Sequence, residues 1–265
     1  MRIGNAVLLA VLVGGGLSAC GSTEHKLAGP PKETTFGLQS KLLGRTMYEE
    51  LITPAGGGKG RPLLVFLHGY GGSPSGTVTP TLIAALRRLG DRAPVVLLPE
   101  GLTGWWHDDE DGPWGSYVLK EVIPAGLERS GADSDRVAIG GISMGGFGAL
   151  DLGRIAPERF CAVGGHSPAV YTSGSDDALF AFDGPADFAR HDLLTLARNA
   201  SPYDAPVWLD VGDQDSLLPA TETLARELED DGADVSFHVW PGNHNGPYWN
   251  RHFADYLAFY VNACS

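Results

Sequence analysis

Basic residues and cysteines are both scarce in this chain of 265 residues. Lysine and arginine together number 19 against 32 aspartates and glutamates, which gives a formal net charge of −13 at pH 7. Because the phosphates of nucleic acids require positive charge on their partner, this balance argues against a nucleic-acid partner. The three cysteines and eight histidines show no spacing typical of a metal site, so we expect neither a metal ion nor another cofactor.

Long apolar runs are also missing. The apolar stretch at residues 3–13 is shorter than the ~20 residues that span a bilayer, and three glycines break it at residues 14–16. Arg2 precedes this stretch and the motif Leu-Ser-Ala-Cys follows it, a pattern typical of a bacterial lipoprotein signal. We therefore expect a signal peptide at residues 1–19 and acyl chains on Cys20 that anchor the exported protein to the outer face of a membrane. A transmembrane anchor is the alternative.

The rest of the chain has the length of one domain, without repeats or low-complexity segments. Residues 20–33 are polar and contain two consecutive prolines, which predicts a lipidated tether. The domain itself is expected to cover residues 34–265.

Short apolar strands alternate with helical patterns along this domain. Because crossover connections of this length join parallel strands, the pattern predicts an α/β fold with a mostly parallel central sheet flanked by helices. Residues 36–52 predict an antiparallel hairpin at the start of the sheet, and residues 171–206 predict a short helical insertion over the site. The expected strands are residues 63–67, 95–98, 136–139, 162–165, 207–211 and 235–240, and the expected helices include residues 80–89 and 115–129, with Pro124 bending or interrupting the second.

A glycine-flanked serine joins one of these strands to the next helix. Gly141 and Gly145 flank Ser143 where strand and helix crowd together, so a side chain at either glycine would clash while the serine hydroxyl stays open. This arrangement is typical of the nucleophile elbow of an α/β-hydrolase. A glycine-rich turn without chemistry is the alternative, and the order of the segments around it argues against that interpretation.

A serine nucleophile needs a histidine base and an acid, and candidates for both follow two later strands. Asp215 follows the strand at residues 207–211, and His244 follows the strand at residues 235–240. The chain order Ser, Asp, His at the carboxyl ends of strands is that of α/β-hydrolases. His244 is expected to take the proton of Ser143, and Asp215 to hold the imidazole in the right tautomer. Asp213 is the runner-up for the acid.

Other residues are candidates for the oxyanion hole and for substrate binding. The backbone N–H groups of Met144 and Tyr70 are expected to stabilise the oxyanion. Trp105 and Trp106 follow a strand end and are candidates for lining the acyl or alcohol pocket, with packing of a long loop as the equal alternative. Trp249 is expected to face the site or to start the packed face of the last helix. The acidic run at residues 108–111 predicts a solvated loop, with calcium binding as a weaker alternative.

Together these motifs resemble the esterase D-like branch of α/β-hydrolases, which includes S-formylglutathione hydrolases, feruloyl and acetyl-xylan esterases and actinobacterial mycolyltransferases. The resemblance is most specific at residues 67–72, 141–150 and 242–249. It implies a serine carboxylic-ester hydrolase without a cofactor that acts through an acyl-enzyme. The expected substrate is a small-molecule or cell-wall carbohydrate ester at the cell envelope. An acyltransferase with the same triad and a non-catalytic envelope protein on a hydrolase scaffold are the alternatives.

Cys161 and Cys264 remain once Cys20 is set aside, and an exported compartment allows them to pair. In this fold, the start of the strand after the elbow helix and the end of the last helix both lie at the lower edge of the sheet. We therefore expect a disulfide, with two buried free thiols as the alternative.

Overall fold

The computed structural model describes residues 27–172, 178–198 and 203–265. The expected signal peptide, the lipidation at Cys20 and the first half of the tether lie outside the described residues. Among the residues that are described, no helix is long and apolar enough to cross a membrane.

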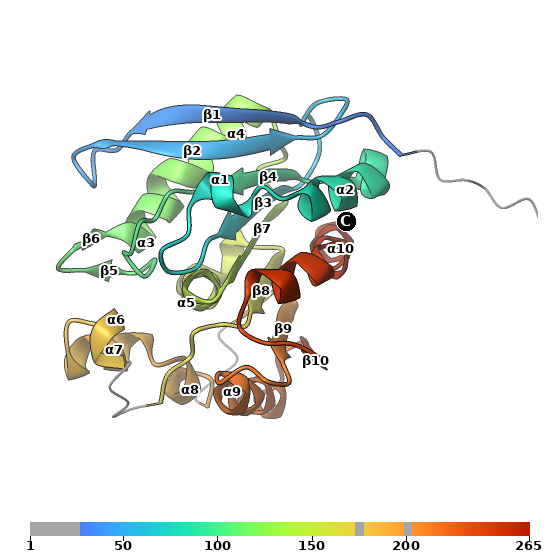
Figure 1. Cartoon of the computed structure of the whole chain (residues 1–265). Helices are drawn as coiled ribbons and strands as arrows, with labels where there is room; N and C mark the ends of the chain where they lie inside the picture. Colours follow the sequence, from blue (N-terminus) through green and yellow to red (C-terminus); the bar gives the residue numbers. More distant parts are fainter. Residues whose placement is uncertain (1–26, 173–177, 199–202) are drawn as a thin grey trace, which may run out of the picture.

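Eight strands form one central sheet, with parallel pairing throughout its middle and one end (Figure 1). The predicted α/β-hydrolase fold is therefore confirmed. In spatial order the strands are β1 (Lys32–Gln39), β2 (Thr46–Thr53), β4 (Val95–Leu98), β3 (Leu63–Leu67), β7 (Val137–Ile142), β8 (Ala162–His166), β9 (Val207–Gly212) and β10 (Val235–Trp240).

The predicted hairpin at the start of the sheet is confirmed, because β1 and β2 pair antiparallel from Lys32 opposite Thr53 to Gln39 opposite Thr46. The folded part begins earlier than expected. β1 starts two residues before the predicted boundary at residue 34, and the N–H of Ala28 donates to the carbonyl of Arg87 at 3.0 Å. Residues 28–33 therefore belong to the domain and not to a free tether.

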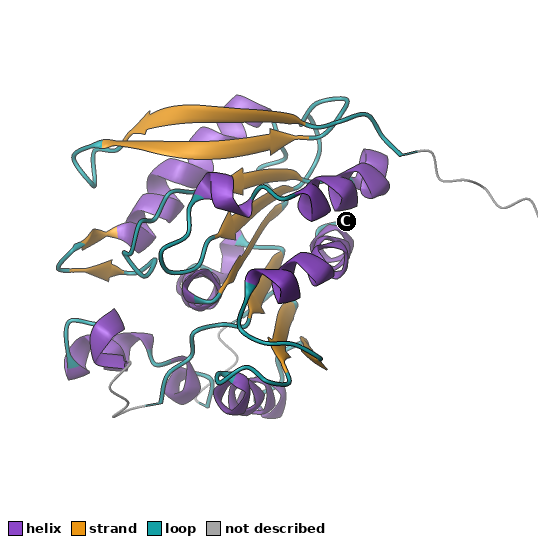
Figure 2. Ribbon diagram, in the orientation of Figure 1, coloured by secondary structure: helices purple, strands orange, loops and turns teal. Residues whose placement is uncertain are grey.

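Helices cover both faces of the sheet (Figure 2). Alternate residues of β3 point to opposite sides, so Leu63 and Val65 belong to one apolar core while Leu64 and Phe66 belong to the other. The first core is closed by α3 (Trp114–Tyr117), α4 (Ile123–Ser130), α5 (Met144–Ile155) and α9 (Leu218–Asp230), and the second by α2 (Pro80–Leu89) and α10 (Gly246–Ala263).

The expected helix at residues 115–129 is interrupted as predicted near Pro124. A π-helical turn, Val118–Val122, lies between α3 and α4. Proline has no N–H to donate to the preceding turn, so the regular α-helical hydrogen bonds cannot continue through this point.

The insertion at residues 171–206 contains three short helices and, in its described part, no strand. They are α6 (Ala178–Ala181), α7 (Pro185–His191) and α8 (Leu193–Leu196). This agrees with the predicted helical insertion, but none of its described residues lines the cavity at Ser143, so the predicted position over the site is not borne out.

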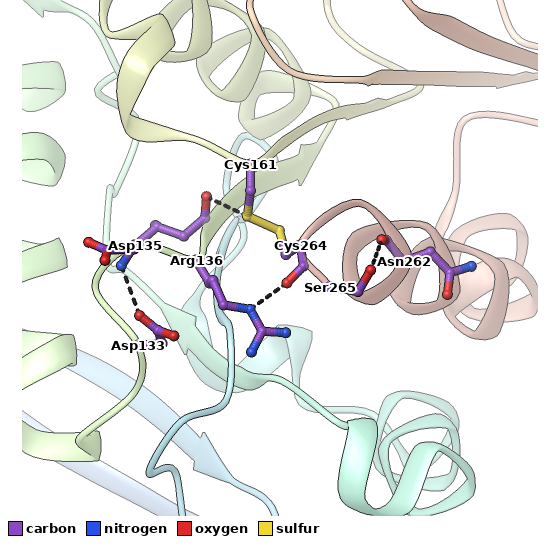
Figure 3. The surroundings of a disulfide bond; sticks show 8 residues. Asp133, Asp135, Arg136, Cys161, Asn262, Cys264 and Ser265 are labelled. Atoms are coloured by element: carbon purple, nitrogen blue, oxygen red, sulfur yellow. Dashed lines mark hydrogen bonds between the residues drawn. A yellow bond between two sulfur atoms is a disulfide. The ribbon is translucent and has the colours of Figure 1, made fainter.

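A disulfide joins Cys161 to Cys264, as expected, with 5.2 Å between the Cα atoms (Figure 3). Cys161 directly precedes β8, and Cys264 follows the last residue of α10. Arg136 supports the same junction, because its Nε donates to the carbonyl of Cys264 at 2.5 Å. The bond lies at the amino ends of the parallel strands, opposite the end where Ser143 lies.

Candidate active site

Ser143 lies at the turn between β7 and α5 with a φ of 56° and a ψ of −119°, a strained conformation for a residue with a side chain. A Cβ atom added to Gly141 would lie 2.4 Å from the carbonyl oxygen of Gly145. One added to Gly145 would lie 2.1 Å from the carbonyl oxygen of Leu67. Only glycine fits at these two positions, and the tight turn presents the Ser143 hydroxyl at the carboxyl end of the strand.

The structure brings the three sequence-predicted triad residues together from separate loops. His244 Nε2 lies 2.8 Å from Ser143 Oγ, and His244 Nδ1 lies 2.8 Å from Asp215 Oδ2. With Nδ1–H donating to the carboxylate, Nε2 carries the lone pair that accepts the serine proton. The arrangement can therefore generate a serine nucleophile.

The acid next to His244 is Asp215, and not the runner-up Asp213. Burial alone would raise the pKa of the Asp215 carboxyl, but hydrogen bonds from His244 and from the Leu217 N–H outweigh it and hold that pKa below its ordinary value. Asp215 thus stays ionised at neutral pH. Asp213 is exposed and instead accepts a hydrogen bond from the Gly242 N–H at 3.0 Å.

The loops that carry Asp215 and His244 are fastened to each other. The N–H of Asp213 donates to the carbonyl of Trp240 at 2.8 Å, and that of Gln214 donates to the carbonyl of Gly242 at 2.9 Å. These backbone bonds extend the pairing of β9 and β10 beyond the strand ends. They fix the distance between the acid and the base before substrate binds.

Two backbone segments run past the nucleophile where an oxyanion hole is expected. Met144 is the first residue of α5, so its N–H has no acceptor inside the helix. On the other side, a Cβ atom on Gly69 would lie 3.2 Å from Ser143 Cβ, so the backbone leading into Tyr70 passes directly beside the serine. Both sequence-predicted donors therefore belong to segments adjacent to Ser143.

His68 braces the loop that contains Tyr70. Its Nδ1 donates to the carbonyl of Gly69 at 2.8 Å, because a carbonyl can only accept, and its Nε2 accepts from the Gly101 N–H at 3.1 Å. Both ring nitrogens of this buried side chain thus have partners, and Nε2 also lies 3.3 Å from Glu100 Oε1. The side chain therefore ties the loop that contains Tyr70 to the segment after β4.

A cavity of about 450 Å³ opens over Ser143. Trp249 faces it, and its ring centroid lies 5.0 Å from that of His244. Among the described residues that line the cavity there is no lysine, arginine, aspartate or glutamate. The lining consists of His68, Gly69, Tyr70, Gly71, Gly72, Ser73, Gly76, Thr77, Thr79, Ile142, Ser143, His244, Gly246, Trp249, Asn250 and Phe253.

The predicted substrate contact is wrong for Trp106, which is fully buried and lies outside the lining of this cavity. A Cβ atom on Gly148 of α5 would lie 2.3 Å from Trp106 Cβ, and the indole N–H donates to the carbonyl of His68 at 3.1 Å. Trp105 is also buried and outside the lining, with its ring against those of Phe147 and Phe180. Both tryptophans pack the long loop onto the domain, Trp106 against α5 and Trp105 against neighbouring aromatic rings.

The acidic run is solvated as predicted, because Asp108, Glu110 and Asp111 are exposed, but it is not an irregular loop. It forms a small antiparallel hairpin of β5 (Asp108–Asp109) and β6 (Gly112–Pro113). Asp108 accepts hydrogen bonds from the backbone N–H and the hydroxyl of Ser116, and Asp109 accepts from the Gly112 N–H. Asp108 thus has its partner in α3 and Asp109 has its partner in β6.

Sequence reasoning missed a buried polar network beneath the site, centred on Asp210 of β9. Its carboxylate accepts hydrogen bonds from His166 Nδ1 at 2.6 Å, from Trp208 Nε1 at 2.8 Å and from the hydroxyls of Tyr248 and Tyr256 at 2.9 Å each. Burial and the negative charge of Asp210 raise the pKa values of both tyrosines, which therefore remain donors. The network fastens α10, which begins two residues after His244, to the floor of the sheet. A single aspartate inside an otherwise apolar strand was the signal that could have revealed it.

The fold and the Ser-His-Asp arrangement define the class of protein, a serine hydrolase on an α/β-hydrolase scaffold. Residues 40–260 match the family model described as esterase. Because this match covers most of the chain, the chain belongs to the esterase family. By family it is a carboxylic ester hydrolase.

Known proteins similar to the chain include two curated enzymes and one solved structure. The S-formylglutathione hydrolase of Paracoccus denitrificans is 28% identical over 172 residues, 60% of this chain and 61% of that protein. The acetyl esterase of Caldicellulosiruptor saccharolyticus is 25% identical over 224 residues, 72% of this chain and 80% of that protein. A ferulic acid esterase structure superposes with a TM-score of 0.78 at 20% identity, covering 88% of this chain and 98% of that one.

Proposed function

We propose that this protein hydrolyses uncharged carboxylic esters with Ser143 as nucleophile, His244 as general base and acid, and Asp215 as the residue that orients the base. The observation that carries the proposal is the pair of 2.8 Å contacts from Ser143 Oγ to His244 Nε2 and from His244 Nδ1 to Asp215 Oδ2. A neutral imidazole at this distance removes the serine proton as the oxygen attacks the ester carbonyl.

The reaction proceeds in two halves. Attack by Ser143 gives a tetrahedral oxyanion, which the N–H groups of Met144 and Tyr70 stabilise by hydrogen bonding. His244 then donates its proton to the departing alcohol and leaves an acyl-enzyme at Ser143. In the second half His244 deprotonates a water molecule, which attacks the acyl group and releases the acid.

The open site supports hydrolysis over transfer of the acyl group to a second alcohol. The side chain of His244 is 33% exposed, so water reaches the base directly. An acyltransferase needs to exclude water from its acyl-enzyme. A non-catalytic role fits less well, because the three side chains hold a geometry that a scaffold protein does not need.

The cavity lining supports an uncharged substrate. Its polar and ring-bearing side chains are hydroxyls, an amide, aromatic rings and the two histidines, with the half-buried indole of Trp249 beside the reacting centre. Such a surface suits the hydroxyls and apolar faces of an acetylated sugar or an aryl ester. Glutathione thioesters carry two carboxylates, for which the described lining offers no cationic side chain.

The substrate class is tested with purified protein and a panel of esters. The panel contains p-nitrophenyl esters of increasing chain length, an acetylated sugar, a feruloyl ester and S-formylglutathione. We expect kcat/KM to be highest for one of the uncharged esters and lowest for S-formylglutathione. A clear preference for the glutathione thioester would overturn the proposed substrate class while leaving ester hydrolysis intact.

We further propose that the protein is exported and anchored by lipid on Cys20, supported by the signal pattern at residues 1–20. Expressed in a bacterial host, the wild-type chain is expected to incorporate labelled fatty acid and to fractionate with membranes. Cys20→Ser is expected to lose the label, because the thiol accepts the diacylglyceryl group. Absence of label from the wild-type protein would contradict this location.

A further inference from the structure

Two histidines and an aspartate form a buried cluster outside the cavity over Ser143. One potential ligand atom from each of His107, Asp187 and His191 lies within 4.8 Å of the other two. The residues are only 1%, 4% and 8% exposed, respectively. Imidazole and carboxylate groups in this combination are ligands that zinc and related divalent ions prefer.

The cluster connects the helical insertion to the body of the domain. Asp187 and His191 are four residues apart in α7, so they lie on the same side of that helix. His107 belongs to the segment between β4 and β5, and its ring centroid lies 4.5 Å from that of His191. The long separation of His107 from α7 in the chain explains why no metal-ligand spacing was visible in the sequence.

Hydrogen bonds set the protonation state of both imidazoles. His191 Nδ1 lies 2.8 Å from Asp151 Oδ2, so it carries the hydrogen of the neutral ring and Nε2 keeps a free lone pair. His107 Nε2 lies 2.9 Å from the carbonyl oxygen of Ala181, which can only accept. The lone pair of His107 is therefore on Nδ1. Carboxylate and carbonyl groups orient metal-bound histidines in this way in known metal sites.

The unpaired nitrogen His107 Nδ1 indicates that a bound ion is missing from this site. This nitrogen is buried and has no hydrogen-bond partner within the described part of the chain. An acceptor buried without a partner destabilises the folded state, and a bound cation would satisfy it.

We propose that His107 Nδ1, His191 Nε2 and a carboxylate oxygen of Asp187 bind one zinc-type divalent ion that fastens α7 to the domain. His191 Nε2 already lies 3.7 Å from Asp187 Oδ1. Ligand atoms about 2.0–2.1 Å from a tetrahedral zinc are roughly 3.3 Å apart, so small side-chain rotations complete the set. An adjoining cavity of about 330 Å³, lined by both histidines, gives access for the ion and room for a water as fourth ligand.

The charges around the cluster allow a cation. Arg190 contacts Asp187 Oδ1 at 2.6 Å, but its side chain is 62% exposed and can turn into solvent when the metal takes that oxygen. Arg154 is neutralised by Asp151 at 2.6 Å. A further carboxylate, Asp109, lies 3.9 Å from His107 Nε2. The carboxylates near the site therefore outnumber the two arginines.

The proposal is tested by zinc binding to the full-length chain after dialysis against a chelator. All proteins carry His244→Gln, which removes the imidazole of the active site as a competing ligand. Equilibrium dialysis with elemental analysis is expected to give one zinc ion per chain, and the melting temperature is expected to rise with zinc concentration. His107→Gln and His191→Gln are each expected to weaken binding by at least about 100-fold, and Asp151→Asn by on the order of tenfold. His238→Gln, a histidine change in β10, is the matched control and is expected to bind zinc like its parent.

The proposal would be overturned if zinc affinity were unchanged in both His107→Gln and His191→Gln. It would also be overturned if the parent protein, which keeps both histidines, bound well below one zinc ion per chain. Circular dichroism identifies variants that fail to fold, and Asp187→Asn then takes their place. A second measurement replaces zinc with cobalt in the protein that keeps both His107 and His191, and it needs no further variant. Visible absorption bands of four-coordinate cobalt are expected, and a spectrum identical to hydrated cobalt would contradict the site.

Discussion

His244 Nε2 lies 2.8 Å from Ser143 Oγ, although the two residues are 101 positions apart in the chain. Nothing between them in sequence sets this distance. It follows from the sheet, because the elbow and the loop after β10 both lie at the carboxyl ends of parallel strands. The backbone bonds between the Asp215 and His244 loops then hold the base in place.

Asp215→Asn is expected to lower kcat by roughly 10⁴, because an amide in place of the carboxylate favours the wrong tautomer of His244. Asp213→Asn is the matched change two residues away. Its carboxylate accepts a hydrogen bond from the Gly242 N–H, whereas His244 bonds to Asp215, so Asp213→Asn is expected to change kcat far less. Steady-state hydrolysis of a p-nitrophenyl ester compares the two. The reverse ranking would move the acid to Asp213.

Glu49 is expected to make stability depend on pH. Burial raises the pKa of its carboxyl from 4.5 to about 7, even though hydrogen bonds from Tyr117 and the Glu100 N–H act in the opposite direction. Between these two values the folded state binds more protons than the unfolded state, so stability falls as pH rises. The loss amounts to about 3 kcal/mol between the unfolded and the folded pKa.

Urea unfolding from pH 4.5 to pH 8 measures this contribution of Glu49. The Glu49→Gln variant is the control, since it keeps a similar shape and cannot ionise. Its free energy of unfolding is expected to fall less than that of the wild type across the same range. Identical pH dependence of the two proteins would show that the Glu49 carboxyl does not titrate abnormally.

Reduction of the Cys161–Cys264 disulfide is expected to lower the melting temperature. The two residues are 103 positions apart, and closing a loop of that length stabilises by up to ~5 kcal/mol in the chain-entropy model. Hydrolysis rates well below the melting temperature are expected to change little, because the bond lies at the opposite end of the strands from Ser143. The double variant Cys161→Ser, Cys264→Ser serves as control and is expected to melt at the same temperature with and without reductant.

The elements and the triad could be predicted because their signals are local. Gly141, Ser143 and Gly145 form one motif within five residues, and Asp215 and His244 each follow within four residues of a strand end. Side-chain partners from distant segments carry no such signal. The sequence places Trp106 after a strand end but does not show that Gly148 of α5 leaves the space that buries it.

The Asp210 network and the histidine cluster were missed for the same reason. Asp210 finds its donors on β8, on its own strand and on α10, and only the assembled fold brings these together. His107 meets Asp187 and His191 only after the insertion has folded back onto the domain. Both groups of residues form through tertiary contacts, and the spacing of these residues in the sequence does not predict such contacts.

The most direct test of the account is the rate of ester hydrolysis by Ser143→Ala. This change removes one hydroxyl of a half-buried side chain that lines the cavity, so the fold is expected to remain intact by circular dichroism. Loss of a triad serine costs on the order of 10⁶ in kcat. Ser73→Ala is the control, because Ser73 lines the same cavity but caps α1 (Pro74–Thr77), and kcat is expected to stay within about tenfold. Loss of turnover in Ser143→Ala alone is the predicted result, and a Ser143→Ala rate within tenfold of the wild type would contradict the assignment of the nucleophile.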